Sequence, residues 1–109
     1  MPTVPFVEGN PPQEVSLDVE VVHEPTRRRF VARAGGRESH LFYIPAEQGV
    51  VEFRTTYVDP ALRGQGVGEK LVLAAFAWAK DQGLAVIPTC WYVGTVVRRH
   101  PEFEGLLRR

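Results

Sequence analysis

Three glycines within five residues give this chain a backbone suited to binding phosphate. Gly64, Gly66 and Gly68 follow Arg63 and lead into a long run with helical periodicity. Because glycine has no Cβ, the backbone at these positions can approach another group closely. At a helix start, the free backbone N–H groups and the positive end of the helix dipole attract an anion. The sequence therefore predicts a pyrophosphate-binding loop from about Arg63 to Gly68.

Two common phosphate-binding motifs do not fit this loop. A P-loop requires a glycine at the position of Glu69 and a serine or threonine after Lys70, where Leu71 stands. A dinucleotide-binding fingerprint read from Gly64 also requires its third glycine at Glu69. A carboxylate pointing at the site would repel phosphate. The loop therefore belongs to a different class of phosphate site.

Composition limits the classes of protein to consider. The chain has 109 residues, which favours a single domain, and its formal net charge of zero argues against a protein that mainly neutralises nucleic-acid phosphates. The single cysteine, Cys90, excludes an internal disulfide and a cysteine-rich metal site, so no metal is expected. A reducing cytoplasm is the compartment that this predicts. No apolar run approaches the roughly 20 residues of a membrane helix, so no membrane partner is expected.

The hydrophobic pattern predicts an α+β fold with a mixed sheet. Period-two alternation and short turns predict an antiparallel four-strand meander before the glycine loop. In the fourth strand, Val51, Phe53, Thr55 and Tyr57 are predicted to share one face. Residues 1–13 hold four prolines and are expected to form an extended or disordered arm, with a single domain over 14–109. The predicted strands are Val15–Val21, Arg28–Ala34, His40–Ile44 and Val50–Val58.

The chain after the glycine loop predicts a helix, a fifth strand and a short second helix. The helix from about Gly66 to Gln82 carries a wide apolar stripe, so it should lie flat on the sheet with Glu69 and Lys70 pointing outward. The wholly apolar segment Leu84–Pro88, reached through this helix, should run parallel to the fourth strand. A second helix begins after Cys90 and ends before Pro101.

These elements and motifs resemble the GNAT superfamily of N-acetyltransferases. The loop Arg63-x-x-Gly66-x-Gly68, preceded by Thr56-x-Val58-x-Pro60, is similar to the acyl-CoA pyrophosphate loop of that superfamily. Two further motifs narrow the resemblance to the small, minimal YjdJ-type N-acetyltransferase-like family: Pro88-Thr89-Cys90 and His100-Pro101-Glu102. The resemblance covers roughly Val19 to Leu107. The resemblance implies a GNAT-like core and an acetyl-CoA-dependent N-acetyltransferase.

The resemblance also assigns a site for coenzyme A. The fourth strand would offer its backbone to the acyl group and the pantetheine arm, the loop amides would bind the pyrophosphate, and Lys70 would add positive charge. The acceptor would be a small amine or a protein amino group. The cofactor-binding residues implied are Thr56, Val58, Arg63, Gly64, Gln65, Gly66, Val67, Gly68 and Lys70.

Three residues are candidates for catalysis. Glu52 could act on an amine through water. Cys90 follows the fifth strand and starts a helix, where the helix dipole can lower a thiol pKa. It could therefore accept the acyl group in a two-step transfer. Alternatively, Cys90 is a small buried apolar residue without a catalytic role. His100 could be its base only if the second helix folds back, and otherwise caps that helix. Many of the GNAT enzymes that this chain resembles have a tyrosine in the helix after the fifth strand, which protonates the leaving thiolate. By this resemblance the corresponding position is Val97, and Tyr92 lies one turn too early.

Two functions remain open on the sequence alone. One is the N-acetyltransferase, and the other is an acyl-CoA-binding module without efficient catalysis, acting as a sensor or partner-binding protein. The resemblance implies an acceptor site built by one or two helices between the first strands. The short segment from Val21 to Phe30 leaves no room for such helices, so the acceptor side would be open or completed by another subunit, as in a homodimer. A weaker alternative, nucleic-acid binding through Arg27, Arg28 and Arg29, conflicts with the zero net charge.

Overall fold

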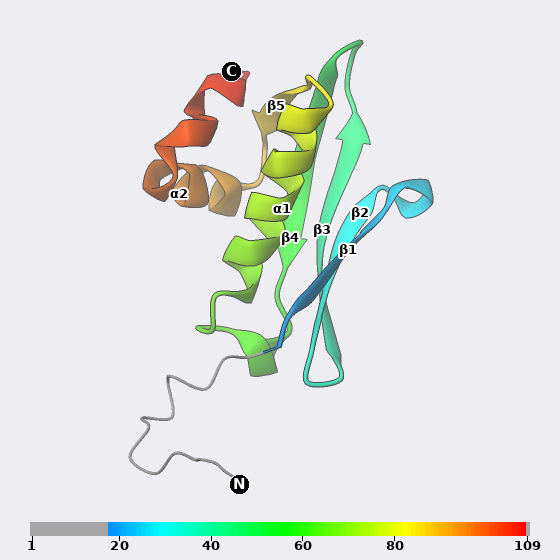
Figure 1. The fold of residues 1–109 in the computed structure, drawn as a ribbon, viewed down its shortest axis with the longest axis vertical. Coiled ribbons are helices and arrows are strands. Elements are labelled where there is room, and N and C mark those ends of the chain that lie inside the picture. Colours follow the sequence, from blue (N-terminus) through cyan, green and yellow to red (C-terminus); the bar gives the residue numbers. More distant parts are fainter. Residues whose placement is uncertain (1–17, 109) are drawn as a thin grey trace, which may run out of the picture.

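The computed structural model describes residues 18–108, and the arm expected for residues 1–13 lies outside this range. Five strands form one mixed sheet in the order β1-β2-β3-β4-β5, and α1 lies across one face of it (Figure 1). The strands are β1 (Glu20–Glu24), β2 (Arg29–Ala34), β3 (Arg37–Pro45), β4 (Val50–Tyr57) and β5 (Ala85–Pro88). The helices are α1 (Val67–Asp81) and α2 (Trp91–Arg99), with short 3₁₀ turns η2 (Pro25–Arg27), η3 (Pro60–Leu62) and η4 (Pro101–Leu106).

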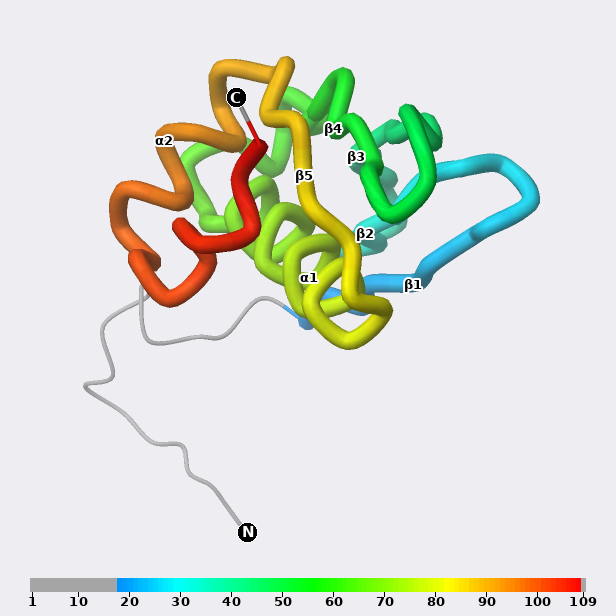
Figure 2. The backbone as a smooth tube through the Cα atoms, turned by 90° about the horizontal axis from the view of Figure 1, so that it is seen from above, coloured from blue at the N-terminus to red at the C-terminus, as the bar shows by residue number. Residues whose placement is uncertain are grey.

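The predicted topology is confirmed. Strands β1 to β4 pair antiparallel in sequence order, and β5 pairs parallel to β4 after the α1 crossover. Seen from above, the sheet curves around α1, and α2 with the C-terminal segment lies on the β5 side (Figure 2). Within the described residues the first strand begins at Glu20, and its predicted start at Val15 lies outside them. Within residues 18–108, no helix combines the length and the apolarity that crossing a membrane requires.

A β-bulge in β4 changes which of its side chains face α1. Neighbouring residues of β3 pair with Phe53 and Thr55, so Arg54 is left without a partner position. An extra residue of this kind reverses the facing of all side chains that follow it. The prediction that Thr55 and Tyr57 share the face of Phe53 is therefore wrong. The exposed side chains after the bulge are Thr55 and Tyr57, and the partly buried ones are Thr56 and Val58.

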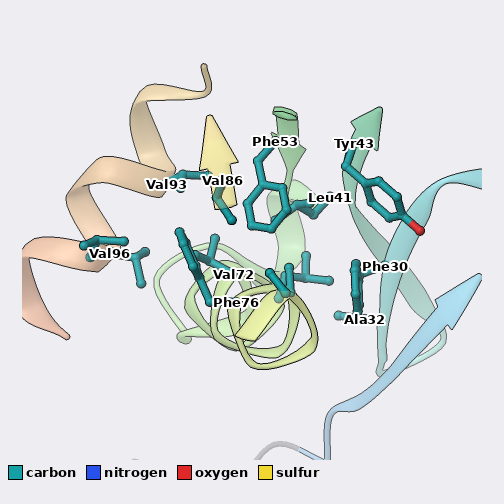
Figure 3. Packing of buried hydrophobic residues seen from close by; sticks show 14 of the residues in the cluster. Phe30, Ala32, Leu41, Tyr43, Phe53, Val72, Phe76, Val86, Val93 and Val96 are labelled. Atoms are coloured by element: carbon teal, nitrogen blue, oxygen red, sulfur yellow. The ribbon is translucent and has the colours of Figure 1, made fainter. Parts of the chain in front are cut away.

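The core joins α1 to the sheet on one side and to α2 on the other. Phe76 of α1 is fully buried, with its ring centroid 5.2 Å from Phe53 of β4 and 5.3 Å from Phe103 of η4. Val93 and Val96 of α2 are also fully buried and approach Phe76 from the other side (Figure 3). Because one side chain contacts three elements, the position of α2 depends on the packing around Phe76.

Phe76→Ala is expected to lower the free energy of unfolding by about 3–5 kcal/mol, since it removes a buried ring and leaves a cavity. Phe42→Ala is the matched control, because Phe42 is 38% exposed on the opposite face of the sheet and should cost about 1 kcal/mol or less. Urea unfolding followed by far-UV circular dichroism measures both. Equal losses for the two variants would contradict this description of the core.

Candidate functional site

A cleft of about 560 Å³ opens where β4 ends and both helices begin. The parallel pairing of β4 and β5 runs only from Val50 with Ala85 to Phe53 with Pro88. The backbone N–H of Cys90 then donates to the carbonyl of Phe53 at 3.1 Å, and beyond this bond the two chains separate. The cleft occupies that separation. Its lining residues are Thr56, Tyr57, Val58, Leu62, Arg63, Gly64, Gly66, Val67, Gly68, Glu69, Cys90, Trp91, Tyr92 and Arg99.

The loop between β4 and α1 is held to β3 through Asp59. The backbone N–H of Asp59 donates to the hydroxyl of Ser39 at 3.0 Å, and Ser39 is fully buried. The carboxylate of Asp59 accepts from the backbone N–H of Ala61 at 2.8 Å, which caps η3, and lies 3.6 Å from Arg37. Anchored at this end, the loop presents its glycines at a fixed place on the cleft wall.

The glycine loop presents unbonded backbone donors beside the cleft. Gly64 and Gly66 both have φ of +79°, a left-handed conformation that glycine adopts without steric cost. Across residues 18–108, the N–H groups of Gly64, Gly66 and Gly68 have no hydrogen-bond acceptor. The Nε of Arg63 donates to the carbonyl of Val58 at 3.2 Å, which places this side chain along the wall. These donors, at the positive end of α1, form a site suited to an anion.

Glu69 lines the cleft, so the prediction that it points outward is wrong. Its carboxylate is hydrogen-bonded to the imidazole of His100 and lies 3.2 Å from Arg99, because the end of α2 packs beside the start of α1. The hydrogen bond to His100, followed by that to Arg99, holds the pKa of Glu69 below its ordinary value. The negative charge that should repel phosphate is thus paired with two basic side chains.

Tyr92 lines the cleft, although the sequence places it one turn too early in α2 for the tyrosine that protonates the thiolate. A Cβ built on Gly68 would lie 3.0 Å from the ring and hydroxyl of Tyr92 and 3.0 Å from Val58. Burial, and next the charge of Glu69, raise the pKa of the Tyr92 phenol, so it stays protonated at neutral pH. The sequence signal that could have identified it is Gly68 itself, a glycine inside a helix whose backbone needs no positive φ.

The predicted cofactor residues fall into two groups. All of them line the cleft except Gln65 and Lys70. The side-chain amide of Gln65 donates to the carbonyl of Ala61 at 3.1 Å within the loop, and Lys70 is exposed. The cleft residues that the sequence did not single out as ligand-binding are Tyr57, Leu62, Glu69, Trp91, Tyr92 and Arg99.

Of the three catalytic candidates, the structure places only Cys90 in the cleft. Its Sγ lies 3.6 Å from the hydroxyl of Thr56, across the point where β4 and β5 separate. Glu52 accepts a hydrogen bond from the hydroxyl of Thr89, and His100 is bound to Glu69 as described. Neither Glu52 nor His100 lines the cleft. Within the described range, no group of three or more His, Cys, Asp or Glu is placed to hold a metal ion.

Gly68→Ala is expected to destabilise the protein by about 1 kcal/mol, because crowding against Tyr92 and Val58 exceeds the gain in helix propensity. The same change in a Tyr92→Ala background should cost at least about 0.5 kcal/mol less. Gly94→Ala in α2 is the control, since no atom lies within 4 Å of a Cβ built there, and it should stabilise by up to about 1 kcal/mol. Urea titration of the wild type, Gly68→Ala, Tyr92→Ala and the double variant gives the coupling energy, and strict additivity would contradict the close contact.

Comparisons with known proteins identify similar chains and a similar fold. The chain is 32% identical over 95 residues to Protein NATD1 of Bos taurus, covering 85% of this chain and 82% of that one, and 30% identical over 90 residues to the Homo sapiens protein of that name, covering 81% and 80%. The solution structure of a GCN5-like protein from Staphylococcus aureus shares the fold, with a TM-score of 0.62 at 21% identity over 86% of this chain and 90% of that one. The profile of the GCN5-related N-acetyltransferase family matches residues 29–106, and this chain belongs to that family.

Proposed function

We propose that the protein binds acetyl-coenzyme A in this cleft and transfers the acetyl group to an amine. The observation that carries the proposal is the row of unbonded N–H groups at Gly64, Gly66 and Gly68, set beside a gap between β4 and β5. An anion held by the loop would leave the attached arm free to follow the second half of β4. Membership in an acetyltransferase family supports the same assignment.

The charges around the cleft favour a diphosphate. Arg63 and Arg99 line the cleft, and Glu69 is paired with His100 as well as Arg99. The positive end of the α1 dipole adds to the attraction for an anion. In the proposed complex the loop amides bind the pyrophosphate, and the backbone at Thr56 and Val58 faces the pantetheine arm.

The thioester would lie near Thr56 and Cys90, at the closed end of the gap. Attack by an amine develops negative charge on the carbonyl oxygen and releases a thiolate, so both a hydrogen-bond donor and a proton donor are required. The protonated phenol of Tyr92 lies in the cleft and is the proton donor that we propose for the thiolate. Cys90 offers a second route, in which its thiol first accepts the acetyl group.

One observation favours the alternative, an acyl-CoA-binding module without efficient transfer. A direct transfer needs a base for the amine proton, but Glu52 and His100 do not line the cleft. Glu69, the carboxylate that does line it, is already bonded to two basic side chains. A slow or absent transfer reaction would follow if no other group removed this proton.

Binding is tested by isothermal titration with acetyl-CoA. Gly66→Ala places a side chain at φ +79° and should distort the loop, lowering affinity at least about tenfold. Gly35→Ala is the matched control, because Gly35 has φ +57° in the β2–β3 hairpin and is likewise clear of atoms within 4 Å. Both variants should lose similar stability, but only Gly66→Ala should lose affinity. Wild-type protein that shows no heat of binding would overturn the proposal.

Transfer is tested by following free thiol released from acetyl-CoA over a panel of amines. Tyr92→Phe should lower kcat about 100-fold or more with little change in acetyl-CoA affinity, because it removes the proton donor and keeps the ring. Cys90→Ala separates the two routes, and unchanged turnover would remove Cys90 from the mechanism. Acetyl-CoA binding without amine-dependent thiol release would select the binding module.

A further inference from the structure

A second hollow, of about 570 Å³, lies at the opposite end of α1 from the glycine loop. Its lining residues come from the β3–β4 hairpin, the end of α1 and the turn between β1 and β2, three elements whose positions Figure 1 shows. None of its lining residues also lines the cleft described above. We call it the distal pocket and define it by Arg28, Tyr43, Glu47, Trp78 and Leu84.

The distal pocket has a preformed aromatic wall. The ring centroids of Trp78 and Tyr43 lie 5.0 Å apart. The hydroxyl of Tyr43 is hydrogen-bonded to His23 at 2.5 Å, and the imidazole of His23 is stacked on Phe30 at 4.2 Å. These contacts fix Tyr43 and Trp78 before any ligand arrives, as is usual for small-molecule sites.

The charge of the distal pocket is positive and uncompensated. Within residues 18–108 the guanidinium of Arg28 makes no hydrogen bond or ion pair, whereas that of the adjacent Arg29 lies 2.6 Å from Glu24. The acidic residue of the pocket, Glu47, is paired with Arg108 at 2.8 Å. An anionic ligand would therefore find a free guanidinium and a carboxylate that is already neutralised.

The backbone at Arg28 is strained, and glycine or asparagine would be favoured there. Its φ is +53°, a left-handed conformation that costs an ordinary side chain on the order of 1 kcal/mol. The N–H of Arg28 donates to the carbonyl of Pro25 at 3.1 Å, and its carbonyl accepts from the N–H of Tyr43 at 3.0 Å. These bonds hold the residue at the pocket rim, so the arginine at this position is best explained by the use of its side chain.

Trp78 offers a second free donor. Its indole N–H has no hydrogen-bond partner among the described residues. Every buried side-chain nitrogen and oxygen in that range has a partner, so this unpaired N–H is not buried and is open to solvent. Arg28 and Trp78 both line the distal pocket, so a guanidinium and an indole are among the donor side chains nearest to a ligand carboxylate there.

We propose that the distal pocket binds a small aromatic carboxylate. Its carboxylate would pair with Arg28 and accept from the indole N–H of Trp78, and its ring would lie against Tyr43 and Trp78. The positive charge of Arg28 disfavours cationic ligands, and the aromatic wall disfavours small hydrated anions. This site is separate from the acetyl-CoA cleft, and its test does not depend on transferase activity.

Phenylacetate is the probe. Trp91→Phe, which replaces a side chain that is 78% exposed, leaves Trp78 as the single indole of the chain. Titration of this variant should shift the indole ¹⁵N–¹H resonance of Trp78 in a saturable way and change its fluorescence. Phenethyl alcohol, which has the ring without the charge, should bind at least tenfold more weakly.

Arg28→Asn removes the guanidinium and retains a residue that tolerates positive φ, so it should fold normally and weaken phenylacetate binding at least tenfold. Arg27→Asn is the matched control, since Arg27 is exposed and does not line the pocket, and its affinity should stay within twofold. No saturable shift up to about 10 mM phenylacetate, or equal losses in the two arginine variants, would overturn the proposal.

Discussion

The hydrogen bond between the N–H of Cys90 and the carbonyl of Phe53 is the point on which the candidate site depends. It is the last backbone hydrogen bond between these two parallel segments, and it occurs just before the Arg54 bulge on one of them and the first turn of α2 on the other. A parallel pair that continued further would close the gap. A pair that ended earlier would leave Phe53 without a neighbour and expose the core. Because the bond lies directly beside the buried Phe53–Phe76 contact, the packing that stabilises the domain also determines where the gap opens.

The two ends of α1 have different chemical surroundings. Its first turn has glycines, unbonded amides and a paired carboxylate, whereas its last turns carry Trp78 against Tyr43. The helix spans 15 residues, roughly 22 Å, so the two hollows are well separated. A single rigid element packed along its whole length against the sheet holds both of them in place. A change in packing at the middle of the helix would therefore shift the residues that line both hollows.

Local signals in the sequence predicted most of the fold, and tertiary contacts account for what they missed. The strands, the loop and α1 follow from alternation, glycine spacing and a wide apolar stripe, each of which is a property of neighbouring residues. The bulge at Arg54 could not be located from the local pattern, because Arg54, Thr55 and Thr56 are all polar and their order does not indicate which face each one takes. Glu69 could not be placed because its partners, Arg99 and His100, lie about 30 residues away and reach it only after α2 packs. Cys90 lies in the cleft, whereas His100, its candidate base, is bonded to Glu69 through the same long-range packing.

The Arg54 bulge divides β4 into a first half that packs in the core and a second half that borders the cleft. Before it, Val51 and Phe53 face the interior; after it, the same inward direction is taken by Thr56 and Val58, which border the cleft. Substitutions in the first half act on folding, and those in the second act on whatever occupies the gap. Substitutions that change ligand preference can therefore accumulate in the second half of β4 without disturbing the core packing of the first half.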